Sequence, residues 1–429
     1  MDIYHSNRNK FNVVNLATLI HKIAKLSKQR HQFDFRLWNQ DKNDFIRSFY
    51  NRINSLITHF NSQELANTIW ALATLKVNYP ELINLVVNES IQKISQFNSQ
   101  HLANTIWAMA TLKVNHSQLI SMIANESIQK ISQFNCQELV NTIWALATLK
   151  VNHPQLTHLI SSKIVNKISQ FNPQDLANTI WVLATLKLND SQLINIISQE
   201  CIKKISQFSC QNLANTIWAL ATLKVNHSQL THLIASESIH KISQFSRQDL
   251  ANTIWALATL NSYHSELFSR IASLVKKHLA NFNKTNIRQI YYVYLVAKYI
   301  WKIDDIDDLL PLNVIKPFFN LQKIEVNPSK LQKEVFQFVS QQINCQNEFI
   351  TEEFLSIDIA IQESRIAIEV NGPYHYLSDK SLDGSSNSKY RLLEQLGWEV
   401  IVISYSKWDE LSTTDKTNYI NDLLNSSVC

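Results

Sequence analysis

The sequence predicts an α-solenoid of helix-turn-helix repeats followed by a small α/β domain. Tryptophan recurs at intervals of 37 residues, at Trp70, Trp107, Trp144, Trp181, Trp218 and Trp255. Phenylalanine keeps the same interval, at Phe60, Phe97, Phe134, Phe171, Phe208 and Phe245. The periodicity ends after Trp301, and short apolar strand-like runs follow. A fixed period of this length is typical of stacked repeats, so we expect a right-handed solenoid with a concave groove.

Each repeat is expected to hold two helices, as the unit beginning at Phe60 illustrates. Its first helix is predicted over about 63–76, where leucine and isoleucine recur at helical spacing. Asn61 is the expected cap, and Glu64 stands three residues later as its capping-box partner. Because this part of the chain has no glycine, Asn78 is the expected left-handed residue that ends the helix.

Five segments follow from these patterns. They are a degenerate amino-terminal capping repeat with an insertion around Trp38 (1–59), six complete repeats (60–281), a degenerate capping repeat (282–300), an acidic linker (301–327) and the α/β domain (328–429). Residues 1–281 carry a net charge of +11 and residues 282–429 one of −6, which suggests two different tasks. The first 371 residues contain no glycine, which nearly excludes a glycine-rich phosphate loop there.

Composition also restricts the setting of the protein. No run of 18 uncharged apolar residues occurs, so we expect no membrane contact, and the first residues show no secretory signal pattern. The five cysteines are scattered and never form a CxxC pair, which argues against disulfides and thiolate zinc sites. We therefore expect an intracellular, cytoplasmic monomer; a mitochondrial or other organellar matrix is the alternative if the source is eukaryotic.

Two stripes on the first helices are candidates for binding. The tryptophans could stack on bases, although packing between neighbouring helices is the favoured interpretation. On the same helices an amide ladder recurs at Asn67, Asn104, Asn141, Asn178, Asn215 and Asn252. Amides can contact base edges, phosphates and sugars, but a buried ladder bonding from repeat to repeat explains them equally well.

The fifth position of the repeat varies, and variation between near-identical units is where RNA readout could reside. It is occupied by Glu64, His101, Glu138, Asp175, Asn212 and Asp249. Helix capping explains the acidic members but leaves His101 unexplained, so a code of one base per repeat is the minority hypothesis. Two lysine ladders, one beginning at Lys76 and one at Lys93, could follow a phosphate backbone or simply be solvated.

The carboxyl-terminal domain is expected to contain a hairpin that brings two carboxylates together. If residues 357–361 and 366–370 pair around a turn at Glu363 and Ser364, then Asp358 lies opposite Glu369. The isoleucines at 357, 359, 361, 366 and 368 would share the apolar face. Opposed carboxylates are destabilising unless a cation lies between them, which points to Mg²⁺ bound by Asp358 and Glu369.

These residues resemble a known module. The segments IDIAI, IEVNGPYHY and KYRLLEQLGWEVIVISYSKW closely resemble the RAP domain, an RNA-associated module similar to the PD-(D/E)xK nuclease fold. The 37-residue units resemble octotricopeptide repeats, and the combination is typical of RNA-processing factors, including FAST-kinase-like proteins. The resemblance places Asp358 and Glu369 on the metal carboxylates of the nuclease fold. Asn371 stands where the motif has lysine, and Lys389 or His375 could substitute for that cation.

The sequence therefore predicts a single-stranded RNA-binding protein that acts in RNA processing, stability or translation. Its RAP domain would be a weak or inactive Mg²⁺-dependent endoribonuclease, with Asp358, Glu369, Asn371, His375 and Lys389 as the candidate catalytic residues. The alternative is a helical-repeat scaffold for protein partners without RNA cleavage.

Overall fold

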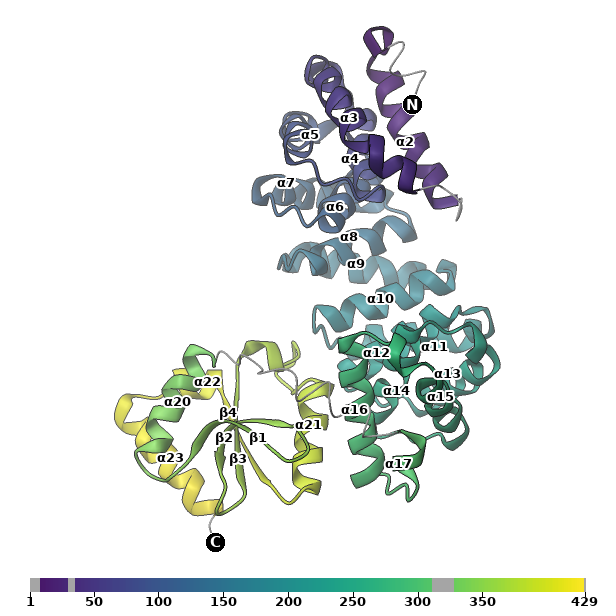
Figure 1. Cartoon of the computed structure of the whole chain (residues 1–429). Helices are drawn as coiled ribbons and strands as arrows, with labels where there is room; N and C mark the ends of the chain where they lie inside the picture. Colours follow the sequence, from purple (N-terminus) through teal and green to yellow (C-terminus); the bar gives the residue numbers. More distant parts are fainter. Residues whose placement is uncertain (1–7, 30–34, 311–327, 428–429) are drawn as a thin grey trace. The chain divides into compact units, whose positions relative to one another are not determined.

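The structure, a computed structural model, describes residues 8–29, 35–310 and 328–427. The chain divides into two compact units, Met1–Val182 and Leu183–Cys429. The first unit holds stacked helical repeats, and the second holds the remaining repeats and a small α/β domain (Figure 1). The predicted fold class is confirmed.

The first helix of each repeat begins at a capping residue, as the sequence pattern predicts. These helices are α4 (Ser62–Thr74), α6 (Ser99–Leu112), α8 (Cys136–Thr148), α10 (Pro173–Thr185), α12 (Cys210–Thr222), α14 (Arg247–Thr259) and the degenerate α16 (Lys284–Tyr299). The carboxylate of Glu64 accepts from the Asn61 N–H at 2.7 Å, and the Asn61 side chain accepts from the Glu64 N–H at 3.1 Å. This reciprocal capping box satisfies donors that the first turn leaves free.

The second helix of each repeat ends in a short 3₁₀ turn that leads to the next phenylalanine. These helices are α5 (Pro80–Lys93), α7 (Ser117–Lys130), α9 (Pro154–Lys167), α11 (Ser191–Lys204), α13 (Ser228–Lys241) and α15 (Ser265–His278). The turns are η3 (Ile94–Gln96), η4 (Ile131–Gln133), η5 (Ile168–Gln170), η6 (Ile205–Gln207), η7 (Ile242–Gln244) and η8 (Leu279–Asn281). Phe60, Phe97, Phe134 and Phe171 are fully buried beside these turns, which explains their fixed spacing.

The first helices do not end where the sequence predicted. The left-handed residue is Lys76, with φ of 52°, rather than Asn78. The same slot is left-handed at Lys113, Lys150, Lys187, Lys224 and Asn261. The helix already closes at Lys76, whose N–H donates to the Ala73 carbonyl at 3.1 Å while the Val77 N–H donates to the Leu72 carbonyl at 2.9 Å. Asparagine is a better left-handed residue than lysine, but this bonding pattern, which resembles a Schellman motif, sets the position.

The lysine ladder that begins at Lys93 ties neighbouring repeats together. Lys130 Nζ donates to the carbonyls of Ser95 at 2.8 Å and Phe97 at 2.6 Å, and pairs with Glu126 at 2.9 Å. Lys93 and Lys241 make the same three contacts in their repeats. The suggestion that this ladder follows a phosphate backbone is therefore wrong, because these ammonium groups are occupied by the carbonyls that end each 3₁₀ turn.

Three further segments flank the complete repeats. The predicted eroded copy near the amino terminus is α2 (Val13–Gln29), which packs on α4, and it is followed by α3 (Phe35–Asn54) and η2 (Ile57–His59). A short 3₁₀ turn, η1 (Arg8–Lys10), precedes them. The predicted linker at 301–327 contains a short helix, α17 (Ile306–Leu309), and its part from 311 onward lies outside the described residues.

The α/β domain is a four-stranded sheet with helices on both faces (Figure 1). Its elements are α20 (Lys330–Ser340), β1 (Gln346–Ile350), β2 (Ser356–Ile361), β3 (Ile366–Asn371), η9 (Pro373–His375), α21 (Gly384–Gln395), β4 (Glu399–Ser404), α22 (Tyr405–Asp409) and α23 (Thr413–Ser427). The strand order is β1-β2-β3-β4, antiparallel except for the parallel pair β3 and β4, which α21 connects.

The hairpin register is confirmed, but its apolar face is not the predicted one throughout. Ile359 pairs with Ile368 and Ile361 with Ile366, as expected. Ile357, however, packs with the alanines and Trp398 in the other core cluster. The Val370 N–H donates to the Asp358 carboxylate at 2.8 Å, and the ladder between the strands runs only from residue 359 onward. The alternation of faces is therefore interrupted at Asp358.

Within the second unit, helix α21 packs against α12, α14 and α16 of the repeats. Lys187 pairs with Asp383 at 2.5 Å, and Asn189 donates to the Asp379 carboxylate at 2.7 Å. Arg391 Nη2 donates to the Ala258 carbonyl at 2.9 Å. These contacts attach the segment before α21 and the middle of α21 to the chain at the carboxyl ends of α10 and α14.

Candidate nucleic-acid interface and carboxylate cluster

The tryptophans of the first unit form a continuous ladder of rings. The centroids of Trp70 and Trp107 lie 6.4 Å apart, and those of Trp107 and Trp144 lie 6.4 Å apart, each pair tilted by 33°. The rings thus contact one another between neighbouring first helices, as the packing interpretation predicts. They are also only partly buried, so an edge of each remains at the surface. A partly exposed aromatic ladder can both support the stack of repeats and receive an apolar or aromatic ligand.

The amide ladder lies one helical turn from the tryptophans. All six asparagines are partly buried. Asn252 accepts a hydrogen bond from Gln289 Nε2 of the next first helix at 3.0 Å. Among the described residues, the side-chain amides of Asn67, Asn104, Asn141, Asn178 and Asn215 make no hydrogen bond with the protein. A ladder that bonds from repeat to repeat is therefore not seen for these five, and their donors and acceptors are open to solvent or a ligand.

The variable fifth position of the repeat has a structural role in five of the six repeats. The carboxylates of Glu64, Glu138, Asp175 and Asp249 accept from the N–H of their capping residue. His101 takes the same place, because its Nδ1 accepts from the Asn98 N–H at 3.5 Å. Capping therefore also accounts for His101, contrary to the sequence-based argument. The backbone N–H of Asn212 donates to Ser209 Oγ at 3.2 Å, and its side chain makes no capping-box bond in the described residues.

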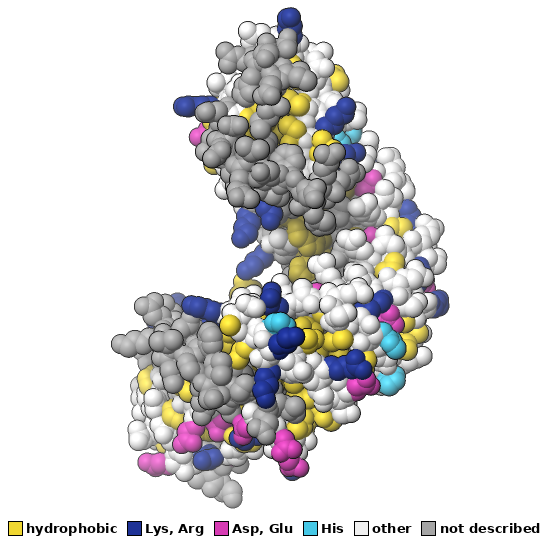
Figure 2. Space-filling view, turned by 45° about the vertical axis from the view of Figure 1, so that its right-hand side comes forward, with side chains coloured by type: hydrophobic (Ala, Val, Ile, Leu, Met, Phe, Trp, Pro, Cys, Tyr) yellow, Lys and Arg dark blue, Asp and Glu magenta, His cyan; other side chains and the backbone are white. Residues whose placement is uncertain are grey.

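The first lysine ladder remains available at several repeats. Lys76, Lys113 and Lys224 are exposed at the ends of their helices, whereas Lys187 is engaged by Asp383. On the face drawn in Figure 2, the basic side chains of the described residues are scattered in small groups rather than gathered into one patch. A strong electrostatic footprint for nucleic acid needs clustered positive charge, so amides and aromatics must carry a large share of any RNA contact on this face.

The two predicted carboxylates of the α/β domain have different environments. Glu369 on β3 is 2% exposed, and Lys389 Nζ donates to its two oxygens at 2.8 and 2.7 Å. Burial raises the pKa of Glu369 to about 7, although Lys389 lowers it in part and Asp358 raises it further. Asp358 lies next to it and accepts from the Val370 N–H. A lysine from α21 thus provides positive charge beside Glu369.

Two residues that the sequence did not single out complete this cluster. Gln332 on α20 donates from Nε2 to the Glu348 carboxylate at 2.6 Å and to the Asp358 carbonyl at 3.3 Å. Burial raises the pKa of Glu348, and Asp358 adds to that shift. The backbone of Glu348 has a left-handed conformation, with φ of 53°, and this interrupts β1 at that residue. Gln332 is a single glutamine on a helix, and Glu348 is a single acid in a short edge strand. Neither belongs to a sequence motif, so the sequence did not indicate them.

Asn371 and His375 occupy separate positions. Asn371 is fully buried at the end of β3, where its Oδ1 accepts from the Tyr390 hydroxyl at 2.6 Å. His375 Nδ1 lies 3.0 Å from Ser386 Oγ, and burial lowers the pKa of this histidine. The structure therefore assembles Asp358, Glu369 and Lys389 directly, whereas the nearest contacts of Asn371 and His375 are to α21 side chains outside that triad.

Whether Mg²⁺ fits depends on competition with Lys389. Within the described parts of the chain, no three His, Cys, Asp or Glu side chains form a metal-binding group. Mg²⁺ can be held by one or two carboxylates with water. Both oxygens of Glu369 are, however, already bound by the lysine ammonium. A divalent cation would have to displace this ammonium, so the donor set as folded does not favour it, and the assignment of Mg²⁺ to Asp358 and Glu369 stays a prediction.

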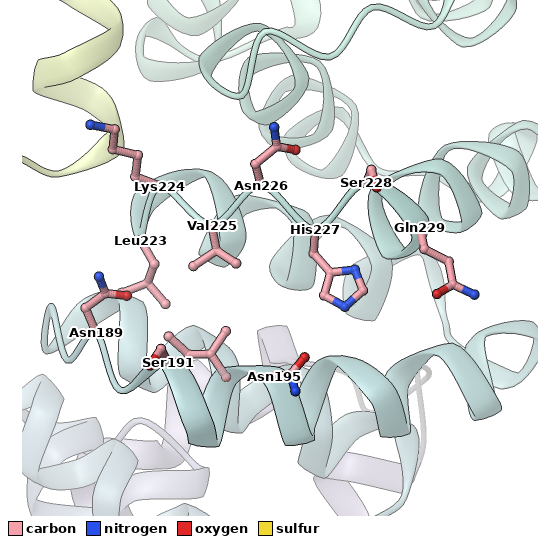
Figure 3. A pocket seen from close by; sticks show the side chains of 11 residues that line it. Asn189, Ser191, Asn195, Leu223, Lys224, Val225, Asn226, His227, Ser228 and Gln229 are labelled. Carbon is pink, nitrogen blue, oxygen red and sulfur yellow. The ribbon is translucent and has the colours of Figure 1, made fainter.

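A cavity in the second unit lies between neighbouring repeats. It has a volume of about 520 Å³ and is bounded by the start of α11 and the turn between α12 and α13. Figure 3 shows Val225, His227 and Asn195 pointing into it, with Lys224 and Asn226 turned away. The imidazole of His227 accepts from the Leu230 N–H at 3.3 Å and so caps α13. His116 and His153 cap their second helices in the same way, whereas His264 makes no side-chain cap bond in the described residues.

Comparison with known families agrees with this architecture. The RAP domain matches residues 368–423, which run from β3 into α23. The fold and the match together define a helical-repeat protein with a carboxyl-terminal RAP domain. The family model of the RNA-editing substrate-binding complex 6 protein matches residues 35–191 and 87–307, more than half of the chain. The chain belongs to this family. No helix in the described residues is long and apolar enough to cross a membrane.

Proposed function

We propose that the repeats bind single-stranded RNA along the stripe formed by the asparagines and tryptophans of the first helices. The observation that carries this proposal is a set of five partly buried amides that have no partner in the part of the protein that the structure describes, each beside a partly exposed tryptophan. Amides can hydrogen-bond base edges, and aromatic rings can stack on bases that are not paired. Double-stranded RNA offers neither to such a stripe, because its bases are stacked and paired inside the helix.

The comparisons support this proposal at the level of the family. The family is named for RNA-editing substrate binding, and the RAP domain is the RNA-associated module that the sequence resembles. The family name also describes a complex, so protein partners are part of the proposal.

Replacement of Asn141 and Asn178 by alanine tests the proposal directly. Both amides lie on the stripe and make no hydrogen bond to any described residue. We expect the double variant to bind an eight-nucleotide single strand about tenfold more weakly, with an unchanged thermal midpoint. The matched control replaces Asn115 and Asn152, which are exposed in the turns between helices, and should bind like the wild type. Equal losses in both double variants would overturn the assignment of the stripe.

A scaffold for protein partners alone is the competing function. Phosphate contacts make the logarithm of the binding constant fall linearly with the logarithm of salt concentration, with a slope set by the number of contacts. A groove built for protein would bind RNA weakly and at sites unrelated to the stripe. Titration of the same strand at several salt concentrations, with both double variants, separates the two.

For the α/β domain we propose RNA contact and leave cleavage as a testable prediction. Asp358 and Glu369 are the candidate Mg²⁺ ligands, and Asn371, His375 and Lys389 are the remaining candidate catalytic residues. Because Lys389 already binds Glu369, any cleavage is expected to be weak or absent in the wild type. Labelled RNA incubated with the full chain and Mg²⁺ measures it, and Asp358→Ala with Glu369→Ala should abolish it without loss of binding.

A further inference from the structure

A small cavity lies where the repeats meet the α/β domain within the second unit. It has a volume of about 250 Å³. Trp255 and Thr259 of α14 and Tyr292 of α16 line it from the repeats. Ser385 and Lys389 of α21 line it from the α/β domain.

The cavity continues the stripe. Trp255 is the tryptophan of the last complete repeat, and Tyr292 holds the same slot in the degenerate repeat that follows, 37 residues later. The two helices are joined on this face, since Gln289 Nε2 donates to Asn252 Oδ1 at 3.0 Å. An RNA strand that follows the amides and rings of the second unit therefore reaches this cavity at the end of its path.

The lining fits one nucleotide. Three aromatic side chains, those of Trp255, Tyr292 and Phe354, line the cavity and offer rings to a base. The hydroxyls of Thr259 and Ser385 can bond the edge of the base or its sugar. The volume of about 250 Å³ lies below the roughly 300–1,000 Å³ of pockets for drug-sized ligands, so only a fragment such as a base with its sugar enters. Lys389 Nζ donates to both oxygens of Glu369, and the third donor of its ammonium group can bond a phosphate. Trp255 and Tyr292 are both partly buried, as expected of rings that form a wall.

We propose that this cavity, between Trp255, Tyr292 and Lys389, captures the terminal nucleotide of the bound RNA strand. The inference rests on the proposed function, because the strand must lie on the stripe to reach the cavity. It goes further in assigning one end of the strand to the α/β domain. The base stacks on the repeat side of the cavity, and its phosphate faces Lys389. A protein segment entering the same cavity is the competing occupant.

The test compares the affinities of RNA strands that differ by one nucleotide at one end. Full-length wild type is titrated with an eight-nucleotide strand and with strands lacking one nucleotide from either end. One stacked base contributes about tenfold in affinity, so removal at one end should weaken binding about tenfold and removal at the other end much less. Trp255→Leu should abolish this difference, so that it binds the full strand and the strand trimmed at the captured end equally well.

Ser385→Leu provides a second variant, because Ser385 is exposed and a leucine there fills the cavity without removing a core side chain. It should also cancel the effect of trimming. Gln395→Leu on the outer end of the same helix is the matched control and should behave as the wild type. If no strand binds the wild type, the proposed function itself fails. If strands bind but trimming acts equally in wild type and both cavity variants, the cavity does not hold the RNA, and a protein occupant is favoured.

Discussion

Lys389 of α21 and Glu369 of β3 form a doubly hydrogen-bonded pair, with Nζ to carboxylate distances of 2.8 and 2.7 Å. The carboxylate is 2% exposed, whereas the lysine side chain is partly exposed. One partner of the pair therefore lies inside the sheet, and the other lies near the surface where α21 packs against the repeats. Because burial raises the pKa of Glu369 to about 7, its charge changes near neutral pH.

Glu369→Gln should remove a pH dependence of the free energy of unfolding. The carboxyl pKa is about 7 in the folded chain against an ordinary value of 4.5, so between these values the folded state holds the extra proton. The stability that this group contributes is present below pH 4.5 and is lost as pH rises through 7, a loss on the order of 3 kcal/mol. Urea unfolding of both proteins across this range measures the difference. Glu363→Gln, in the exposed turn, should keep the wild-type slope.

The two lysine ladders should separate stability from RNA binding. Lys130→Met removes the donor to two backbone carbonyls and is expected to lower the free energy of unfolding by about 1–3 kcal/mol. Lys113→Met, at an exposed left-handed position, should leave stability nearly unchanged. If the exposed ladder contacts phosphate, Lys113→Met should reduce, by about one, the slope of the logarithm of the RNA-binding constant against the logarithm of salt concentration. The opposite pattern would show that the roles of the two ladders are reversed.

Gly384→Ala should loosen the attachment of α21 to the repeats in the second unit. A Cβ at Gly384 would meet the backbone carbonyl of Ala221, which cannot move aside as a side chain can. We expect a loss of roughly 1–3 kcal/mol and faster proteolysis around α21. Gly372→Ala is the control, because no atom lies within 4 Å of a Cβ there. Equal stability of the two variants would show that the close approach is not maintained in solution.

If the repeats bind RNA as proposed, their number should set the length of the strand that binds. Six complete units with degenerate copies at each end predict a site of roughly six to eight nucleotides, at one base per repeat. Affinity measured against strands of increasing length should rise to this length and then level off. A steady rise well beyond it would contradict readout by individual repeats.

The repeats were predictable from the sequence because every copy repeats the same local chemistry. The capping pair of Asn61 and Glu64 and the fixed phenylalanine each carry a signal that six copies reinforce. The helix end was not predictable in the same way. Lysine is an uncommon left-handed residue, and only the pattern of backbone hydrogen bonds places it at Lys76 rather than Asn78.

The carboxylate cluster was predictable only as far as one hairpin reaches. The pairing of Ile359 with Ile368 follows from alternation and turn length, and it brings Asp358 near Glu369. Gln332 and Glu348 come from elements separated from the hairpin in sequence, so only the tertiary fold brings them there. The bond between Lys389 and Glu369 likewise depends on how α21 crosses the sheet, which no local pattern specifies.

The lysines that bind the turn of the preceding repeat make the two ends of the array different. In four repeats a lysine donates to backbone carbonyls at the turn that ends the repeat before it, as Lys130 does to the carbonyls of Ser95 and Phe97. At the position equivalent to this lysine the last complete repeat has His278, and the phenylalanine that should be held there, Phe245, is less buried than its equivalents. Removal of repeats from the amino-terminal side takes away only the backbone carbonyls to which the next lysine donates. Removal of repeats from the carboxyl-terminal side takes away the lysine that binds the carbonyls of the new last turn. Arrays truncated at the amino-terminal side should therefore be more stable than arrays truncated at the carboxyl-terminal side. The junction at His278, which lacks the lysine, is where we expect neighbouring repeats to separate first.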